Sequence, residues 1–299
     1  MAKTSFSDEI AKNKRFSVIL AVVVSLFLFF LIYFIVYFFI PEFVLVVLPV
    51  SILFIVIYTY SSYRFGDSIV LSTTNAKPAD PIKHRYLLDT VEGLSIASGI
   101  PAPKTYVIEN QDLNAFATGR NPENASIAVT TGLIDTLNRQ ELEGVVAHEI
   151  SHIKNRDILF MTLIAVLVGL AAILSHFLIR SMWFGGQRNR RDKGGGIIVI
   201  VFLVGLFLAV FAPIATRLVQ FAVSRKREYL ADASGVSVTR YPEGLASALE
   251  KIANKNQGRM KVSDAVSHLF FVDPQKSSLD SLFATHPPIR ERIKKLRQM

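Results

Sequence analysis

Four long runs of apolar residues interrupt the polar pattern of this chain. The first covers residues 16–40 without a charged residue, the second covers residues 44–63, and only residues 41–43 separate them. A helix rises 1.5 Å per residue, so each run is long enough to cross a hydrocarbon core of roughly 30 Å. The two runs therefore predict a transmembrane hairpin, and the first is too long for the core of a cleaved signal peptide.

Basic residues flank the outer ends of this hairpin and are absent from its turn; they are Lys3, Lys12, Lys14, Arg15 and Arg64. Short cytoplasmic flanks of membrane helices are enriched in Lys and Arg. We therefore expect a multi-pass protein of the cell (inner) membrane. Its N-terminus and the polar part that follows the hairpin should face the cytoplasm.

The other two apolar runs cover residues 158–179 and 197–216. Their lengths favour two further membrane spans, and a re-entrant or interfacial pair is the alternative. The loop between them would lie outside the cell if both runs crossed, yet it is basic, with Arg180, Arg188, Arg190, Arg191 and Lys193. With either topology the chain returns to the membrane surface that it left.

Residues 64–157 have the patterning of a soluble domain. A helix is predicted over residues 81–97 and should end at Gly99, because glycine tolerates the left-handed conformation of a helix cap. Short strands are predicted over residues 105–109 and 126–131, and the second of these alternates apolar and hydroxyl residues. Together with the apolar helices, these elements predict a mainly α protein with a small β-sheet, of the α+β class.

Composition narrows the classes of partner. The formal net charge is +9 and 51% of the residues are hydrophobic. The bases flank apolar runs instead of forming a patch interleaved with aromatic residues, so we expect contact with the lipid bilayer and no nucleic acid. The chain has no cysteine, which excludes disulfides and thiolate zinc sites.

The sequence from His148 to His152 reads His-Glu-Ile-Ser-His. Asn138 and Glu141 predict a capping box for the helix that carries it. On a helix the two imidazoles lie one turn apart on the same face and can bind one metal ion, while Glu149 can act as a general base. The alternative, two solvated histidines on a surface helix, fits poorly with the apolar residues around them.

Catalytic zinc takes three protein ligands and keeps an open position. The third ligand cannot come from the extended motif with a later histidine, because Ile158 stands where that histidine would be. Glu228 is the best candidate, since it follows the fourth apolar run as His152 precedes the third. Asp232, one turn later, is placed to accept a hydrogen bond from a ligand histidine. The alternative is a charged helix end that anchors to lipid headgroups.

His286 is the remaining histidine of interest, in the sequence Thr285-His286-Pro287-Pro288. Two prolines would hold it rigidly before a helix that contains Arg290 and Arg292. Donors held in this way could stabilise an oxyanion. On spacing alone, a structural histidine is the other interpretation.

Four motifs together resemble the HtpX-type membrane metallopeptidases, which are gluzincins related to the CAAX prenyl proteases. They are His148–His152, Glu228–Asp232, the sequence Asn114-Ala-Phe-Ala-Thr-Gly119 and Thr285–Pro288. The resemblance covers nearly the whole chain. It implies one Zn²⁺ per chain, bound by His148, His152 and Glu228, with Glu149 as the catalytic base.

The resemblance also implies further roles. By similarity to the prenyl-protease branch, His286 and Arg292 would face the scissile region of the substrate. An extended substrate would pair with the strand formed by Ser126, Ile127, Ala128, Val129 and Thr130. The expected activity is zinc-dependent endopeptidase cleavage of unfolded or membrane proteins, including self-cleavage, in membrane-protein quality control and the stress response.

These predictions divide the chain into five parts. They are a cytoplasmic N-terminus (residues 1–15), a transmembrane hairpin (16–63), the first half of a zincin-like catalytic domain (64–157), a second hydrophobic pair with a basic loop (158–222) and the second half of the domain (223–299).

Two other classes compete with a protease. A metal-binding scaffold that does not cleave would have no need for Glu149, and a transporter would need ionisable residues within its spans, which the apolar runs almost lack. Metal-dependent cleavage separates the protease from both.

Overall fold

The computed structural model describes most of the chain outside the second hydrophobic pair. The described residues are 15–23, 25, 26, 29, 30, 33, 37, 42, 44–166, 225–256, 260, 262–272, 274 and 287–299, without the side chains of residues 264 and 265. Residues 167–222 of the predicted second pair, the basic loop within it and His286 lie outside the described residues.

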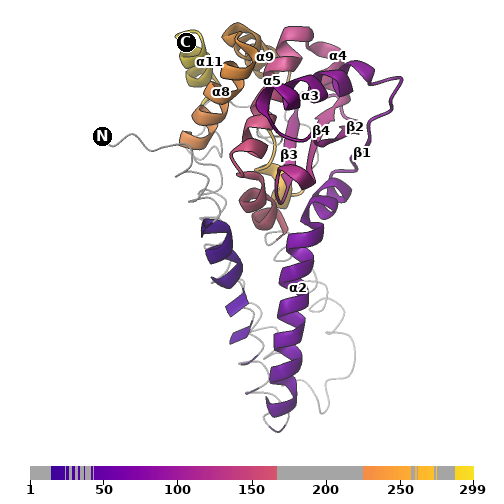
Figure 1. The fold of residues 1–299 in the computed structure, drawn as a ribbon, viewed down its shortest axis with the longest axis vertical. Helices are drawn as coiled ribbons and strands as arrows, with labels where there is room; N and C mark the ends of the chain where they lie inside the picture. Colours follow the sequence, from indigo (N-terminus) through magenta and orange to yellow (C-terminus); the bar gives the residue numbers. More distant parts are fainter. Residues whose placement is uncertain are drawn as a thin grey trace, which may run out of the picture.

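Helix α2 (Val44–Thr73) extends away from the rest of the described chain, with the helical residues 15–23 beside its upper half (Figure 1). It is the one described helix that is long and apolar enough to cross a membrane, with a mean hydropathy of 2.3 in its best window. The helix continues ten residues beyond the apolar run that ends at residue 63. Its buried stripe explains this: Ser62, Gly66 and Val70 are spaced by one turn and face the rest of the protein.

The sheet has four strands in the order β1-β2-β4-β3. They are β1 (Lys77–Pro78), β2 (Lys104–Ile108), β3 (Ala115–Gly119) and β4 (Ala125–Thr130). Strands β2 and β4 are parallel, and the other two pairs are antiparallel. The predicted strands at 105–109 and 126–131 are confirmed to within one residue, whereas β1 and β3 were not predicted from the pattern.

The role predicted for the strand at residues 126–130 is wrong. Strand β4 lies inside the sheet, where β2 pairs with one of its edges and β3 with the other. The backbone groups of Ser126, Ile127, Ala128, Val129 and Thr130 therefore have no free edge to offer an extended substrate. The edge strand next to β4 is β3, and all five of its residues are buried.

Helices cover the sheet and complete the domain. They are α3 (Arg85–Ser98), α4 (Thr131–Thr136), α5 (Arg139–Lys154), α8 (Arg225–Thr239), α9 (Pro242–Lys255), α10 (Asp264–Ser267) and α11 (Ile289–Leu296), with a 3₁₀ turn at Pro122–Asn124. The predicted helix at 81–97 is confirmed as α3. It ends at Gly99, whose φ of 72° is left-handed as expected.

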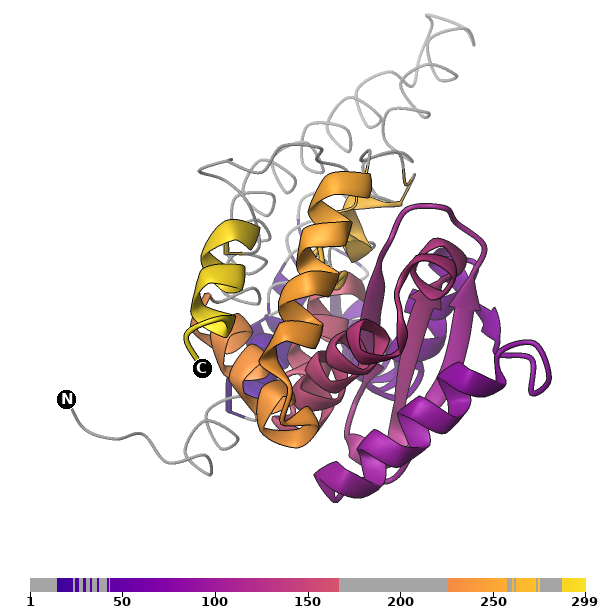
Figure 2. The same ribbon diagram turned by 90° about the horizontal axis from the view of Figure 1, so that it is seen from above.

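Helix α5 is the central element of the domain. It lies between the sheet on one side and α8 and α9 on the other (Figure 2), and it also contacts α3 and β3. Its predicted capping box is present: Asn138 Oδ1 accepts from the Glu141 N–H, and Glu141 Oε2 accepts from the Asn138 N–H. Since every residue from Val145 to Ile153 is buried, polar side chains in this stretch need partners.

Candidate metal centre

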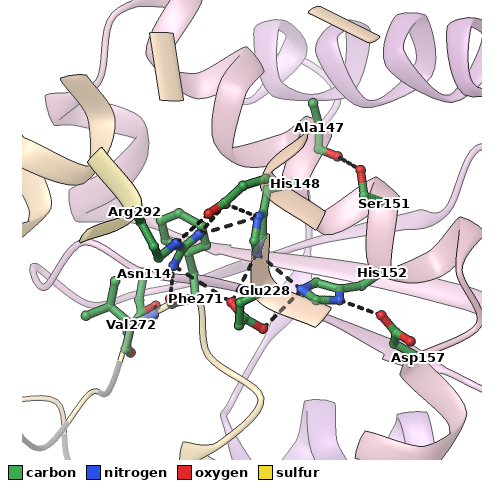
Figure 3. Close-up of polar contacts among 11 residues, drawn as sticks. Asn114, Ala147, His148, Ser151, His152, Asp157, Glu228, Phe271, Val272 and Arg292 are labelled. Atoms are coloured by element: carbon green, nitrogen blue, oxygen red, sulfur yellow. Dashed lines mark hydrogen bonds and ion pairs between the residues drawn. The ribbon is translucent and has the colours of Figure 1, made fainter. Parts of the chain in front are cut away.

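His148 and His152 lie one turn apart on α5 and point to the same place (Figure 3). Their Nε2 atoms are 3.2 Å apart, and both side chains are buried. Glu228 reaches this point from α8, with Oε2 3.6 Å from Nε2 of His148 and Oε1 3.5 Å from Nε2 of His152. Helices from the two halves of the predicted domain thus meet at three convergent side chains.

The donor atoms fit a divalent metal ion. Three ligand atoms each about 2 Å from a tetrahedral ion lie roughly 3.3 Å from one another. The measured separations of 3.2, 3.5 and 3.6 Å fall around this value. Within the described part of the chain, His148, His152 and Glu228 form the group that could hold a metal ion.

Each histidine holds a carboxylate at its other ring nitrogen. Nδ1 of His148 is 2.8 Å from Oδ1 of Asp232, and Nδ1 of His152 is 3.1 Å from Oδ2 of Asp157. An Nδ1–H that donates to a carboxylate leaves the Nε2 lone pair free for a metal. The predicted place of Asp232 therefore agrees with the geometry. No role at the metal centre was predicted for Asp157, which was only the last residue of the first half of the predicted catalytic domain.

Arg292 forms a buried ion pair with Asp232. Its side chain is completely buried, and its Nε and Nη2 donate to the two carboxylate oxygens of Asp232 at 2.9 and 2.7 Å. Its guanidinium stacks over the ring of Phe271, 4.6 Å from the centroid. Two of the nitrogens of Arg292 are thus directed to Asp232, and its predicted place at the scissile region of the substrate stays a prediction.

The charges make the centre strongly favourable for a cation. Burial disfavours protonation of His148, yet hydrogen bonds to Asp232 and Glu228 outweigh burial and raise its pKa to about 9. Burial also opposes ionisation of Asp232, but the adjacent Arg292 lowers the pKa of that carboxyl to about 2. The carboxylate partners of His148 thus stabilise positive charge on this imidazole.

Glu149 is buried beside the two histidines on α5. Burial raises the pKa of its carboxyl above the ordinary value, against the opposing charges of His148 and His152. A carboxyl with a raised pKa exchanges protons more readily near neutral pH. His286 lies outside the described residues, so its role stays a prediction.

Two residues of the centre had no clear signal in the sequence. Phe271 packs its ring edge-on against His148, with centroids 4.9 Å apart, and its N–H donates to the carbonyl of Ala115 on β3. Asp157 offered one signal, an acid directly before an apolar run. Both come from turns, whose path is not visible in hydrophobic periodicity.

Several known proteins are similar to this chain. A model of "Peptidase family M48" matches residues 81–299. A "Protease HtpX homolog" from Caldanaerobacter subterraneus subsp. tengcongensis is 49% identical over 83% of each chain. Another from Dictyoglomus thermophilum is 46% identical over 100% of this chain and 96% of that protein. The solved structure of S. mikatae Ste24p is 21% identical over 97% of this chain and 67% of that chain, with a TM-score of 0.49.

Proposed function

The chain belongs to peptidase family M48 and is a membrane-associated metalloprotease, and we propose that it uses zinc to hydrolyse internal peptide bonds of unfolded or membrane proteins. The convergence of His148, His152 and Glu228 on one point carries this proposal. Two imidazoles and one carboxylate are the ligand set of a catalytic zinc that keeps a fourth position open. A structural site would fill that position with a fourth protein ligand.

In this proposal the residues around the metal site have three separate roles. When bound, zinc supplies a Lewis acid that polarises the scissile carbonyl. His148, His152 and Glu228 hold the ion, and Asp232 and Asp157 orient the two imidazoles. Glu149 takes the proton of the attacking water and delivers it to the departing amine, a task that suits its raised pKa.

The membrane anchor supports the proposed substrate class. The catalytic domain lies at one end of α2 (Figure 1), so the centre is held near the membrane surface. Positive flanks at residues 1–15 and at Arg64 favour the cytoplasmic face. Membrane proteins that have lost their fold expose cleavable segments at this surface, which fits a role in quality control and the stress response. Self-cleavage would follow from the same access.

The test compares detergent-purified wild type with Glu149→Gln, with zinc content and cleavage of an unfolded protein measured in the same samples. We expect the variant to keep its zinc and to cleave about 10²–10⁴-fold more slowly, because the base is lost and the ligands remain. Glu143→Gln on the same helix is the control, since Glu143 pairs with the exposed Arg139. Equal cleavage by Glu149→Gln, or wild type without metal, would contradict the proposal. Electrophoresis of the same samples reports self-cleavage.

A further inference from the structure

We propose that Asp157 is a positioning residue for the metal ligand His152 and that it links the metal centre to residues 158–166, the helical start of the third apolar run. The inference rests on the proposed metal site. Its first observation is the 3.1 Å contact between Oδ2 of Asp157 and Nδ1 of His152, with the Asp157 side chain 1% exposed. A buried carboxylate on the distal nitrogen of a ligand histidine fixes the tautomer and the ring orientation.

The end of α5 explains how a residue so close in sequence can reach back. The Arg156 N–H donates to the carbonyl of Ile153 at 3.1 Å, and the Asp157 N–H donates to the carbonyl of His152 at 3.0 Å. This pair of bonds is the Schellman motif, which reverses the chain over the last turn of a helix. The motif needs a left-handed residue, and Arg156 provides it with a φ of 57°.

The left-handed turn is costly for an arginine. Such a conformation disfavours any residue with a Cβ atom, and glycine is the usual choice at this position. The turn therefore holds a strained residue directly beside the metal centre. Its effect is to bring the Asp157 carboxylate onto His152, and local strain of this kind is found where a function requires the geometry.

The other side of Asp157 is fixed by the helical residues 158–166, which begin directly after it. Thr162 of this segment contacts β3: its hydroxyl lies 2.9 Å from that of Thr118 and accepts from the Gly119 N–H at 3.2 Å. It also lies against α2, where a Cβ added to Gly66 would come within 2.9 Å of the Thr162 methyl group. The membrane helix α2 thus packs closely against residues 158–166, the segment that positions Asp157.

This arrangement makes metal affinity sensitive to the packing of the membrane-side helices. A shift of residues 158–166 moves Asp157, and the imidazole of His152 then loses its orienting partner. His148 is oriented by Asp232 on a different helix and keeps its place. We therefore expect partial loss of metal binding, in contrast to the complete loss that removal of a ligand would cause.

The experiment measures the zinc dissociation constant of the detergent-purified full chain by competition with a chelator, alongside the melting temperature without metal. We expect Asp157→Ala to bind zinc about 10–100-fold more weakly. Asp157→Asn should lose less affinity, because it keeps an oxygen that can accept from the imidazole. The control is Asp89→Ala, since Asp89 is an exposed acid paired with Arg85 on α3. Arg156→Gly should keep wild-type affinity, because glycine favours the same turn.

Each outcome has a defined meaning. If wild type binds zinc and both Asp157 variants bind it equally well, the positioning role is overturned. If Asp157→Ala does not fold, the affinity of the isosteric Asp157→Asn decides. Gly66→Val tests the link to the membrane helix: lowered affinity supports it, and unchanged affinity with a lowered melting temperature overturns it. Wild type that binds no zinc refutes the proposed metal site itself, and this result is distinct from the others.

Discussion

The two metal-binding histidines lie on one helix but depend on very different parts of the chain. His148 is oriented by Asp232 on α8, which is held in turn by Arg292 on α11. His152 is oriented by Asp157, only five residues further along the chain. The first support requires three helices to pack correctly. The second comes from the turn at the end of α5 and from the packing of residues 158–166 that follow it. The support of His148 therefore depends on residues that are much further apart in the sequence than those that support His152.

The remote support is a buried ion pair, which is costly to break. Arg292 and Asp232 are both almost completely buried. Removing one charge leaves the other in an environment of low polarity without its partner. The local support is the contact between the buried Asp157 carboxylate and the His152 imidazole. Removal of this carboxylate leaves no buried guanidinium without its partner. This difference determines the expected order of effects.

The largest effect is expected for Arg292→Met, which keeps much of the volume and removes the charge. It should lower the free energy of unfolding by about 3–5 kcal/mol, because the buried Asp232 then loses its guanidinium partner. Thermal unfolding by circular dichroism measures the change. Arg297→Met, at the C-cap of the same helix, is the matched control. Arg297 is half exposed, with ion pairs to Glu243 and Glu250, so its loss should cost only about 0–1 kcal/mol.

A double variant sharpens this result. In Arg292→Met/Asp232→Asn no charge is stranded, so we expect it to be more stable than Arg292→Met alone. If instead the two losses simply add, the ion pair is not the element that holds α8 and α11 to the centre, and the contrast between remote and local support disappears.

A smaller effect is expected for Gly235→Ala, which tests the contact between α8 and α5. A Cβ at Gly235 would lie 3.1 Å from the His148 nitrogen and 3.2 Å from the Ala147 carbonyl carbon. These are backbone atoms of a central helix, so α8 has to move, and we expect a loss of about 1–3 kcal/mol with weaker zinc binding.

The control for this substitution is Gly93→Ala, because a Cβ at Gly93 meets no atom within 4 Å. It should stabilise α3 by about 0.4–1 kcal/mol through the unfolded chain. Equal melting temperatures for the two alanine variants would mean that the approach of α8 to α5 is not tight, and the remote support would then be more tolerant than we infer.

The smallest effect concerns the start of α5, far from both supports. Burial opposes ionisation of Glu141, but hydrogen bonds from Lys251 and Ser247 outweigh it and lower its pKa below the ordinary value of 4.5. A lowered pKa in the folded state stabilises the protein above pH 4.5, and this stabilisation is lost as pH falls through the folded value.

We therefore expect Glu141→Gln to be less stable than wild type at neutral pH, by about 1 kcal/mol. The difference should shrink below pH 4.5. Melting temperatures of both proteins across this range provide the measurement. A constant difference at all pH values would show that the capping hydrogen bonds of Glu141, and not its charge, stabilise α5.

Local signals in the sequence predicted the local structure well. The capping box at Asn138 and Glu141, the left-handed Gly99 and the helix around Glu228 are all present. Each depends on residues within a few positions of one another, which a single sequence displays. The convergence of His148, His152 and Glu228 also followed from spacing, because the motif fixes two ligands and the return of the chain brings the third.

What the sequence did not predict depends on strand order and on turns. The alternation in β4 indicated a strand but not its neighbours, so the position of residues 126–130 inside the sheet was missed. Strand β3 is buried at every residue and therefore lacks alternation. The contact between Arg292 and Asp232 depends on how α11 packs against α8. The hydrophobic pattern of one helix does not indicate which residue of another helix it contacts.

The dependence of His148 on distant helices also sets the order in which the protein can become active during its synthesis. The two histidines leave the ribosome long before Glu228, Asp232 and Arg292 are made. At about 5–20 residues per second, roughly ten seconds pass between His152 and Arg292. A nascent chain in that interval carries the recognisable motif but lacks its third ligand. Until the C-terminal helices have been made, the chain therefore cannot assemble its full set of metal ligands.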